Sequence, residues 1–145
     1  MPFGRTAVPL VIVPVIRLGI PETDKRLDHN PEGIEVLAET LREVFPVQRF
    51  RFMFGAFSDK ETTASLRLLA PLATEFVFVR PDSTRPSKTA AELESELADV
   101  APSIPASEAG LDDALATLDP AHPTVLCGSL HLCGDVLARL HIPVR

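Results

Sequence analysis

An acid, an imidazole and an amide stand directly before the first long helical pattern of the chain, as Asp28, His29 and Asn30. Asparagine is a favoured N-cap, and the following Pro31 is preorganised for the first position of a helix. The free backbone amides at a helix N-terminus attract anions. We therefore expect Asp28 and Asn30 to reach ribose hydroxyls and His29 to reach phosphate or carboxylate oxygens. The alternative is that Asn30 only caps the helix.

Two later turns have the same form, an apolar segment that runs into the start of a helix, at residues 55–60 and 127–130. In an open parallel sheet, ligands bind beyond the carboxyl ends of the strands, and we expect all three turns to share that edge. Lys60 would supply a cation for phosphate or carboxylate oxygens. Ser58 and Glu61 have the spacing of a capping box, so a purely structural role for Ser58 is the alternative.

Cys127, His131 and Cys133 suggest a metal site, but their spacing fits no standard zinc pattern and no fourth ligand is evident. Cys127 ends an expected buried strand and Cys133 lies on an apolar helix face, where free cysteine packs as a small hydrophobe. We therefore predict two core cysteines and no metal site. The third expected helix carries acids that indicate a solvated face without chemistry: Glu92, Glu94, Glu96 and Asp99.

Strand and helix patterns alternate along the chain, which is typical of an α/β fold with a mostly parallel sheet. The expected strands cover residues 49–54, 75–79, 103–106 and 124–127, and the proline-interrupted run 8–16 favours an edge strand. The apolar faces of the first two helices are predicted at Ile34, Leu37, Ala38, Leu41 and Val44, and at Ala64, Leu68 and Leu69. A capping box from Thr89 to Glu92 starts the third helix.

Composition bounds the class of protein. With 145 residues, 46% of them hydrophobic and 23% charged, the chain suits one domain. The net charge of -6 and the lack of a basic stripe argue against a nucleic-acid partner. The apolar run 7–16 is too short to span a membrane and lacks the flanks of a signal peptide. Together with only two cysteines, these features predict a cytoplasmic protein with reduced thiols.

Four segments, taken in order, resemble one known family. Residues 28–33 are similar to the Asp-Gly-Ala-His-Asn-Pro box that opens the C-terminal domain of folylpolyglutamate and dihydrofolate synthases, members of the Mur ligase superfamily. Residues 54–61 resemble the family's Phe-Gly-Ala-x-x-Asp-Lys-Asp segment, and residues 76–81 resemble its central strand. Residues 127–132 are similar to its closing Gly-Ser-Leu-Tyr-Leu segment. The resemblance covers the chain from about residue 27 to residue 140.

The resemblance implies a Rossmann-like three-layer sandwich over residues 27–145, with a six-stranded sheet containing one antiparallel strand and helices on both faces. Residues 1–26 would be a divergent leader or a first strand. In the family, this domain closes over ATP held by a larger N-terminal P-loop domain, and glutamate attacks an acyl phosphate. The implied ATP contacts are Asp28, His29, Asn30 and, in a possible remnant of another box, Arg5. The implied substrate contacts are Ser58, Asp59, Lys60 and Ser129.

The chain differs from the family pattern in two ways. It contains no Gly-x-x-x-x-Gly-Lys-Ser/Thr segment, and two residues of the first box are absent between Asp28 and His29. We therefore expect a domain that uses ATP and Mg²⁺ only within a complete ligase, with a P-loop domain in trans as partner and no catalysis alone. A fragment, a split gene product or a diverged paralogue would explain it. The alternative is a self-associating structural module with a decayed ligand site, and the third hypothesis is a small independent enzyme.

Overall fold

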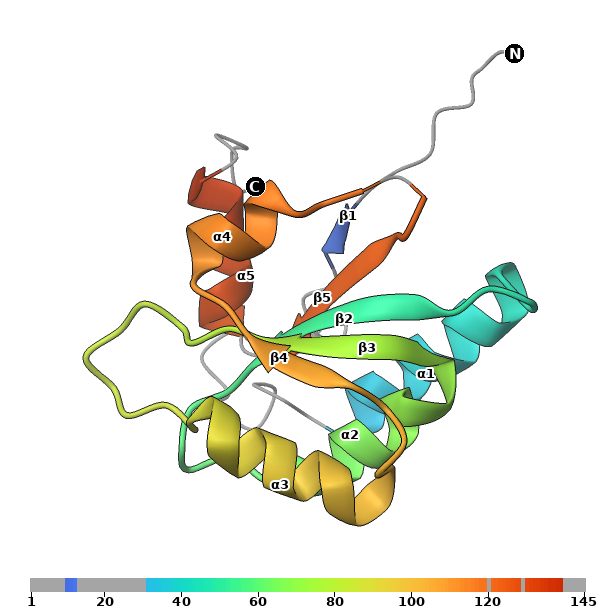
Figure 1. The fold of residues 1–145 in the computed structure, drawn as a ribbon, viewed down its shortest axis with the longest axis horizontal. Coiled ribbons are helices and arrows are strands. Elements are labelled where there is room, and N and C mark those ends of the chain that lie inside the picture. The colour runs from blue at the N-terminus through green and yellow to red at the C-terminus, as the bar shows by residue number, and fades with distance from the viewer. Residues whose placement is uncertain (1–9, 13–30, 120, 129, 140–145) are drawn as a thin grey trace.

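A single parallel sheet forms the centre of the molecule. The computed structural model describes residues 10–12, 31–119, 121–128 and 130–139, and the sheet order is β1-β5-β2-β3-β4 (Figure 1). The strands are β1 (Leu10–Ile12), β2 (Phe50–Gly55), β3 (Ala73–Phe78), β4 (Ala106–Glu108) and β5 (Thr124–Gly128). Every pairing between these strands is parallel. The antiparallel strand that the family resemblance implies is not found within the described ranges.

Helices cover both faces of the sheet, which confirms the predicted three-layer α/β sandwich (Figure 1). The helices are α1 (Pro31–Val44), α2 (Thr63–Leu69), the 3₁₀ turn η2 (Ala70–Leu72), α3 (Ala90–Val100), α4 (Leu111–Ala116) and α5 (Leu130–Arg139). Helices α1, α2 and α3 pack on one face, and α4 and α5 pack on the other. None of the helices described is long and apolar enough to cross a bilayer.

Alternation along β2 and β3 divides the core into two clusters, because successive side chains of a strand point to opposite faces. Phe52 and Phe76 stack on the face of α1 to α3, with ring centroids 5.5 Å apart. Met53 and Val77 join the cluster beneath α4 and α5. The predicted alternation of residues 49–54 is therefore confirmed. Large buried aromatic rings on paired strands make β2 and β3 the centre of the sheet.

Most of the expected helix faces are buried as predicted. Ile34, Leu37, Ala38 and Leu41 of α1 are in the core. Val44 was predicted there wrongly: it is the last residue of α1 and is 60% exposed. In α2, Leu69 is buried as predicted and Leu68 packs partly buried against the core, but Ala64 is only partly buried. The other two buried residues of this helix, Ser65 and Leu66, were not predicted. The inward face of this helix includes a serine, which an apolar pattern does not reveal.

The two edge strands of the sheet lie close to the positions that the sequence predicts. Strand β1 is the edge strand predicted in the run 8–16, and among the described strands β5 is its one neighbour. Strand β4 lies at 106–108 instead of the predicted 103–106, beside β3. The capping box of α3 is confirmed, because Thr89 accepts a hydrogen bond from the Glu92 amide at 3.1 Å while the Glu92 carboxylate accepts one from Thr89 N at 2.9 Å.

Candidate functional site

Two glycine turns meet at the carboxyl edge of the sheet. β2 and β5 end side by side, with Gly55 paired to Gly128 in the strand register. A Cβ atom on Gly55 would lie 2.0 Å from the carbonyl oxygen of Val79, so the neighbouring strand end approaches too closely for any side chain. Gly128 has a φ of 107°, which L-residues rarely adopt. The second and third predicted turns therefore share one edge, as expected.

Five of the predicted site residues lie outside the described residues: Arg5, Asp28, His29, Asn30 and Ser129. The helix that follows Asp28, His29 and Asn30 begins at Pro31, as the sequence predicts. The structure does describe the remaining three predicted residues, Ser58, Asp59 and Lys60, in the turn after β2.

Ser58 belongs to a clamp between the loop after β2 and the loop after β3. Its backbone N–H donates to the carbonyl of Pro86 at 2.8 Å, and its hydroxyl donates to the same carbonyl at 3.2 Å. Phe57 forms an antiparallel bridge with Ser87, and the Lys88 amide donates to the carbonyl of Ala56 at 2.9 Å. These contacts hold two loops, which are distant in sequence, in one fixed arrangement.

The predicted capping box of Ser58 and Glu61 is wrong. Helix α2 begins at Thr63, and the side chain of its N-cap residue makes no cap hydrogen bond. The Glu61 carboxylate accepts a hydrogen bond from the Thr63 amide at 2.9 Å, while Ser58 is engaged by the loop after β3. Local spacing predicts a cap here, but the tertiary contact takes the serine away from the helix.

Asp59 is held by an arginine that the sequence analysis did not identify. The Nη2 atom of Arg85 donates to both carboxylate oxygens of Asp59, at 2.9 and 3.0 Å. The same guanidinium lies 4.1 Å from the centroid of the Phe57 ring. The hydrogen bond from Arg85 lowers the pKa of Asp59 below its ordinary value. Asp59 is thus an ionised anchor for the turn, and no motif in the sequence linked it to Arg85.

Lys60 closes the turn that begins at Phe57. Its backbone N–H donates to the carbonyl of Phe57 at 3.2 Å, and its side chain is partly exposed. The clamp therefore fixes the backbone from which the lysine projects at the carboxyl edge. Its contact with a substrate stays a prediction.

A half-buried polar cluster lies between α2 and α3. Lys88 Nζ donates to Thr62 Oγ1 at 2.7 Å and to Glu96 Oε2 at 2.8 Å. Thr62 donates a short hydrogen bond to Glu96, and Thr63 donates another at 3.1 Å. Partial burial raises the pKa of Glu96, but the hydrogen bonds from Lys88 and the threonines outweigh it and lower the pKa overall.

The prediction of a fully solvated acidic face on α3 is therefore wrong at Glu96. The Glu96 side chain is 21% exposed and that of Lys88 12%. Glu96 stands three residues after Leu93 and just before Leu97, both buried, so it lies at the margin of the buried face. This spacing was the signal in the sequence that the Glu96 side chain could be partly buried.

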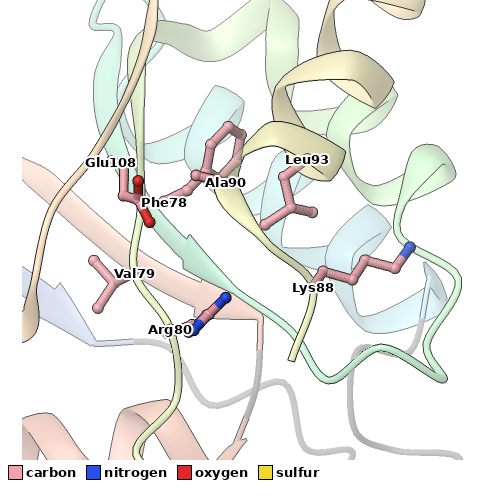
Figure 2. A pocket seen from close by; sticks show the side chains of 7 residues that line it. All are labelled: Phe78, Val79, Arg80, Lys88, Ala90, Leu93 and Glu108. Carbon is pink, nitrogen blue, oxygen red and sulfur yellow. The ribbon is translucent and has the colours of Figure 1, made fainter. Parts of the chain in front are cut away.

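The ends of β3 and β4 enclose a small hollow beside this cluster, shown in Figure 2. The Arg80 and Glu108 side chains point into it, whereas Lys88 turns away toward Thr62. Its volume of about 10 Å³ has room for a single water molecule. The lining residues are Phe78, Val79, Arg80, Lys88, Ala90, Leu93 and Glu108.

A wider groove of about 310 Å³ follows the loop after β3. Its lining combines two guanidinium groups with hydroxyls: Arg80, Pro81, Ser83, Thr84, Arg85, Pro86 and Ser87. Guanidinium and hydroxyl donors suit carboxylate or phosphate oxygens. Because Arg85 already binds Asp59, Arg80 is the cation of this groove that has no ion pair among the described residues.

The two cysteines are core residues, as predicted. Cys127 and Cys133 are buried and unoxidised. Burial raises the pKa of both thiols, that of Cys133 to about 12, so neither is a nucleophile at neutral pH. Within the described ranges, no group of His, Cys, Asp and Glu side chains could hold a metal ion. The structure does not describe the side chain of His131.

Comparison with known proteins gives a consistent result. The family described as Mur ligase, glutamate ligase domain, matches residues 28–130. The folylpolyglutamate synthase of Thermotoga maritima superposes with a TM-score of 0.67 at 24% identity. That of Mycobacterium tuberculosis, complexed with ADP, gives 0.69 at 21%. The bifunctional folylpolyglutamate synthase/dihydrofolate synthase of Yersinia pestis gives 0.60 at 24%.

These superpositions cover 78%, 81% and 79% of this chain, but only 26%, 29% and 27% of the three solved chains. The chain thus spans little more than a quarter of the length of the proteins whose fold it shares. No curated protein sequence matches it significantly.

Proposed function

This chain belongs to the family of Mur ligase glutamate ligase domains, and from this we propose a function. It acts as the C-terminal domain of an ATP-dependent amide ligase of the folylpolyglutamate or dihydrofolate synthase type. The family match over residues 28–130 carries this proposal. In such a ligase the domain contributes nucleotide and amino-acid contacts without being catalytic alone. A P-loop domain in trans would supply the cradle that the sequence lacks.

The described residues fit an anionic ligand at one point of the carboxyl edge. Strand β5 ends at Gly128 and α5, a helix of ten residues, begins at Leu130, and the N-terminus of a helix attracts anions. Beside it stands the clamped turn with Lys60. When bound within a complete ligase, ATP with Mg²⁺ would supply the phosphoryl group that activates a carboxylate. In this chain, Asp28, His29, Asn30 and Arg5 would hold the nucleotide, and Ser58, Asp59, Lys60 and Ser129 the amino acid.

Calorimetry with millimolar ATP and Mg²⁺ tests the nucleotide contact. We expect weak binding heat that Asp28→Ala abolishes and that Glu94→Ala, on the exposed side of α3, leaves unchanged. No heat from the unchanged chain, or equal heat from both variants, would contradict nucleotide binding by the isolated domain.

A second experiment tests the partner. We expect ATP-dependent glutamate ligation only when the chain is mixed with a separately produced P-loop domain of a folylpolyglutamate synthase. Turnover by the chain alone would favour an independent enzyme. Light scattering that shows a stable oligomer, together with no activity in the mixture, would favour the self-associating module instead.

A further inference from the structure

The outward side of α1 carries an apolar stripe that no described part of the chain covers. Val36 and Val44 are 61% and 60% exposed, and Val47, just after the helix, is 96% exposed. Residues 36, 40 and 44 are four residues apart and form one ridge along α1, and Val47 follows in the turn after the helix ends. The hydroxyl of the middle residue, Thr40, donates to the carbonyl of Val36 at 2.8 Å and is thereby satisfied within the helix.

The stripe lies away from the carboxyl edge. Helix α1 ends at Val44 and the chain then enters β2 at Phe50, so Val44 and Val47 stand at the amino end of the central strand. The clamp and the two glycine turns lie at its opposite end. Phe45 packs edge-on against the buried ring of Phe50, with the two ring centroids 5.6 Å apart, and so links the stripe to the core. The surface is therefore separate from the clamp and the glycine turns, and the proposal below does not depend on the nucleotide contacts proposed before α1.

A row of carboxylates runs beside the stripe. Glu35, Glu39 and Glu43 repeat every fourth residue, each one position before Val36, Thr40 and Val44, and all three are exposed. Among the described residues, none of the three is in an ion pair. Like charges four residues apart repel along a helix. Arg42, three residues after Glu39, is the one basic residue of α1, and a cationic partner would offset the repulsion that remains.

We propose that this surface, defined as Val36, Thr40, Val44 and Val47 with Glu35, Glu39 and Glu43, docks an amphipathic helix of another protein whose apolar stripe is flanked by Lys or Arg. Four side chains cover much less than the roughly 800 Å² per partner of a standard interface, which favours one helix over a globular face. An amphipathic helix binds through the apolar residues of one of its faces, and such a face matches the narrow apolar ridge of α1.

Charge argues against a second copy of the chain as the occupant. An antiparallel pairing of two α1 helices about a two-fold axis would place the two glutamate rows side by side. A parallel pairing would align the two helix dipoles. Each copy also carries a net charge of -6. A basic helix avoids the repulsion between two copies of the chain, and its Lys or Arg side chains are attracted to the row of carboxylates.

Fluorescence anisotropy with two labelled helical peptides of about 18 residues tests the proposal. Both peptides have the same leucine stripe, flanked by Lys in one and by Glu in the other. We expect the Lys peptide to bind at least about tenfold more tightly than the Glu peptide, with affinity falling as salt rises. Amide chemical shifts induced by the peptide should be confined to α1 and residues 45–49.

Matched variants separate this surface from general charge effects. Val36→Ser combined with Val44→Ser should abolish binding, and Glu39→Gln combined with Glu43→Gln should weaken it and flatten its salt dependence. Glu94→Gln combined with Asp99→Asn on α3 removes the same charge elsewhere and should change nothing. Circular dichroism confirms that each variant remains folded.

Equal affinity for both peptides, or equal loss in the α3 variant, would overturn the proposal. So would a dimer in sedimentation that the double valine variant dissociates, since the occupant would then be a second copy. Binding of phosphatidylcholine vesicles that the same variant abolishes would assign the stripe to a lipid surface instead.

Discussion

Arg85 Nη2 donates to both carboxylate oxygens of Asp59, at 2.9 and 3.0 Å, across 26 residues of sequence. The same guanidinium covers the ring of Phe57. One side chain thus joins the loop after β3 to two residues of the short turn that carries Lys60. The turn that carries the predicted substrate contacts is held by another loop rather than by its own helix.

Replacing Arg85 by Gln should loosen this turn without unfolding the domain. Exposed ion pairs contribute little to global stability, so we expect the denaturation midpoint to stay nearly unchanged. Hydrogen exchange of the Ser58 and Lys60 amides should become severalfold faster, because both are held inside the clamp. Arg139→Gln, which removes the exposed pair with Asp112 at 3.0 Å, is the control. Unchanged exchange in the turn would show that backbone contacts alone hold it.

Glu96→Gln should destabilise the protein in a pH-dependent way. The pKa of Glu96 is lower in the folded chain than its ordinary value of 4.5, so its ionised form stabilises the fold. This contribution is full above about pH 4.5 and disappears as the pH falls through the folded pKa. At pH 7 we expect a loss of about 1–2 kcal/mol, since Lys88 loses its charged partner while half-buried.

Urea denaturation at pH 7 and at pH 3 measures that difference. Glu94→Gln, on the exposed side of α3, should change stability at neither pH. A loss caused by Glu96→Gln that is equally large at both pH values would mean that packing, rather than charge, accounts for the effect.

Gly55→Ala should damage the carboxyl edge through steric overlap. The added methyl group would meet Val79 O at 2.0 Å and the Leu132 side chain at 3.0 Å. Displacing the end of β3 should cost about 3 kcal/mol or more, at the upper end of what overpacking costs. Gly134→Ala is the matched control, because no atom lies within 4 Å of its added carbon and it sits inside α5. It should stabilise by about 0.5–1 kcal/mol through helix propensity, and calorimetric unfolding compares the two.

The layers of the fold could be predicted from the sequence because they depend on local periodicity. Phe50, Phe52 and Phe54 alternate with Arg51 and Met53, and this pattern placed β2 between two cores. The burial of Cys127 and the capping box at Thr89 likewise depend on near neighbours. Val44 was misplaced because an apolar side chain at the end of a helix face has the same pattern whether it faces the core or solvent.

The contacts of the site could not be predicted in the same way. Asp59 and Arg85 are 26 residues apart, as are Thr62 and Lys88, and no periodicity relates one loop to another. Ser58 had the spacing of a cap, but the carbonyl of Pro86 engages it. The turn pattern and the family resemblance both drew attention to residues 54–61. They identified the turn without identifying the loop that holds it.

Two fully buried threonines should respond in opposite ways to replacement by valine. Thr124 Oγ1 in β5 has no hydrogen-bond partner among the described residues, whereas Thr62 Oγ1 accepts from Lys88 at 2.7 Å and bonds to Glu96. Valine keeps the shape of threonine and removes the hydroxyl. Thr124→Val should therefore be neutral or stabilise by up to about 1 kcal/mol, because an unpaired buried hydroxyl is removed.

Thr62→Val should instead destabilise by about 1–3 kcal/mol, because Lys88 and Glu96 both lose a partner. Urea denaturation of the two variants under identical conditions makes the comparison. If Thr124→Val proved as destabilising as Thr62→Val, its hydroxyl would have to be paired in solution, by a bound water or by part of the chain that the structure does not describe. Opposite signs would show that the polar cluster between α2 and α3 contributes to the stability of the domain.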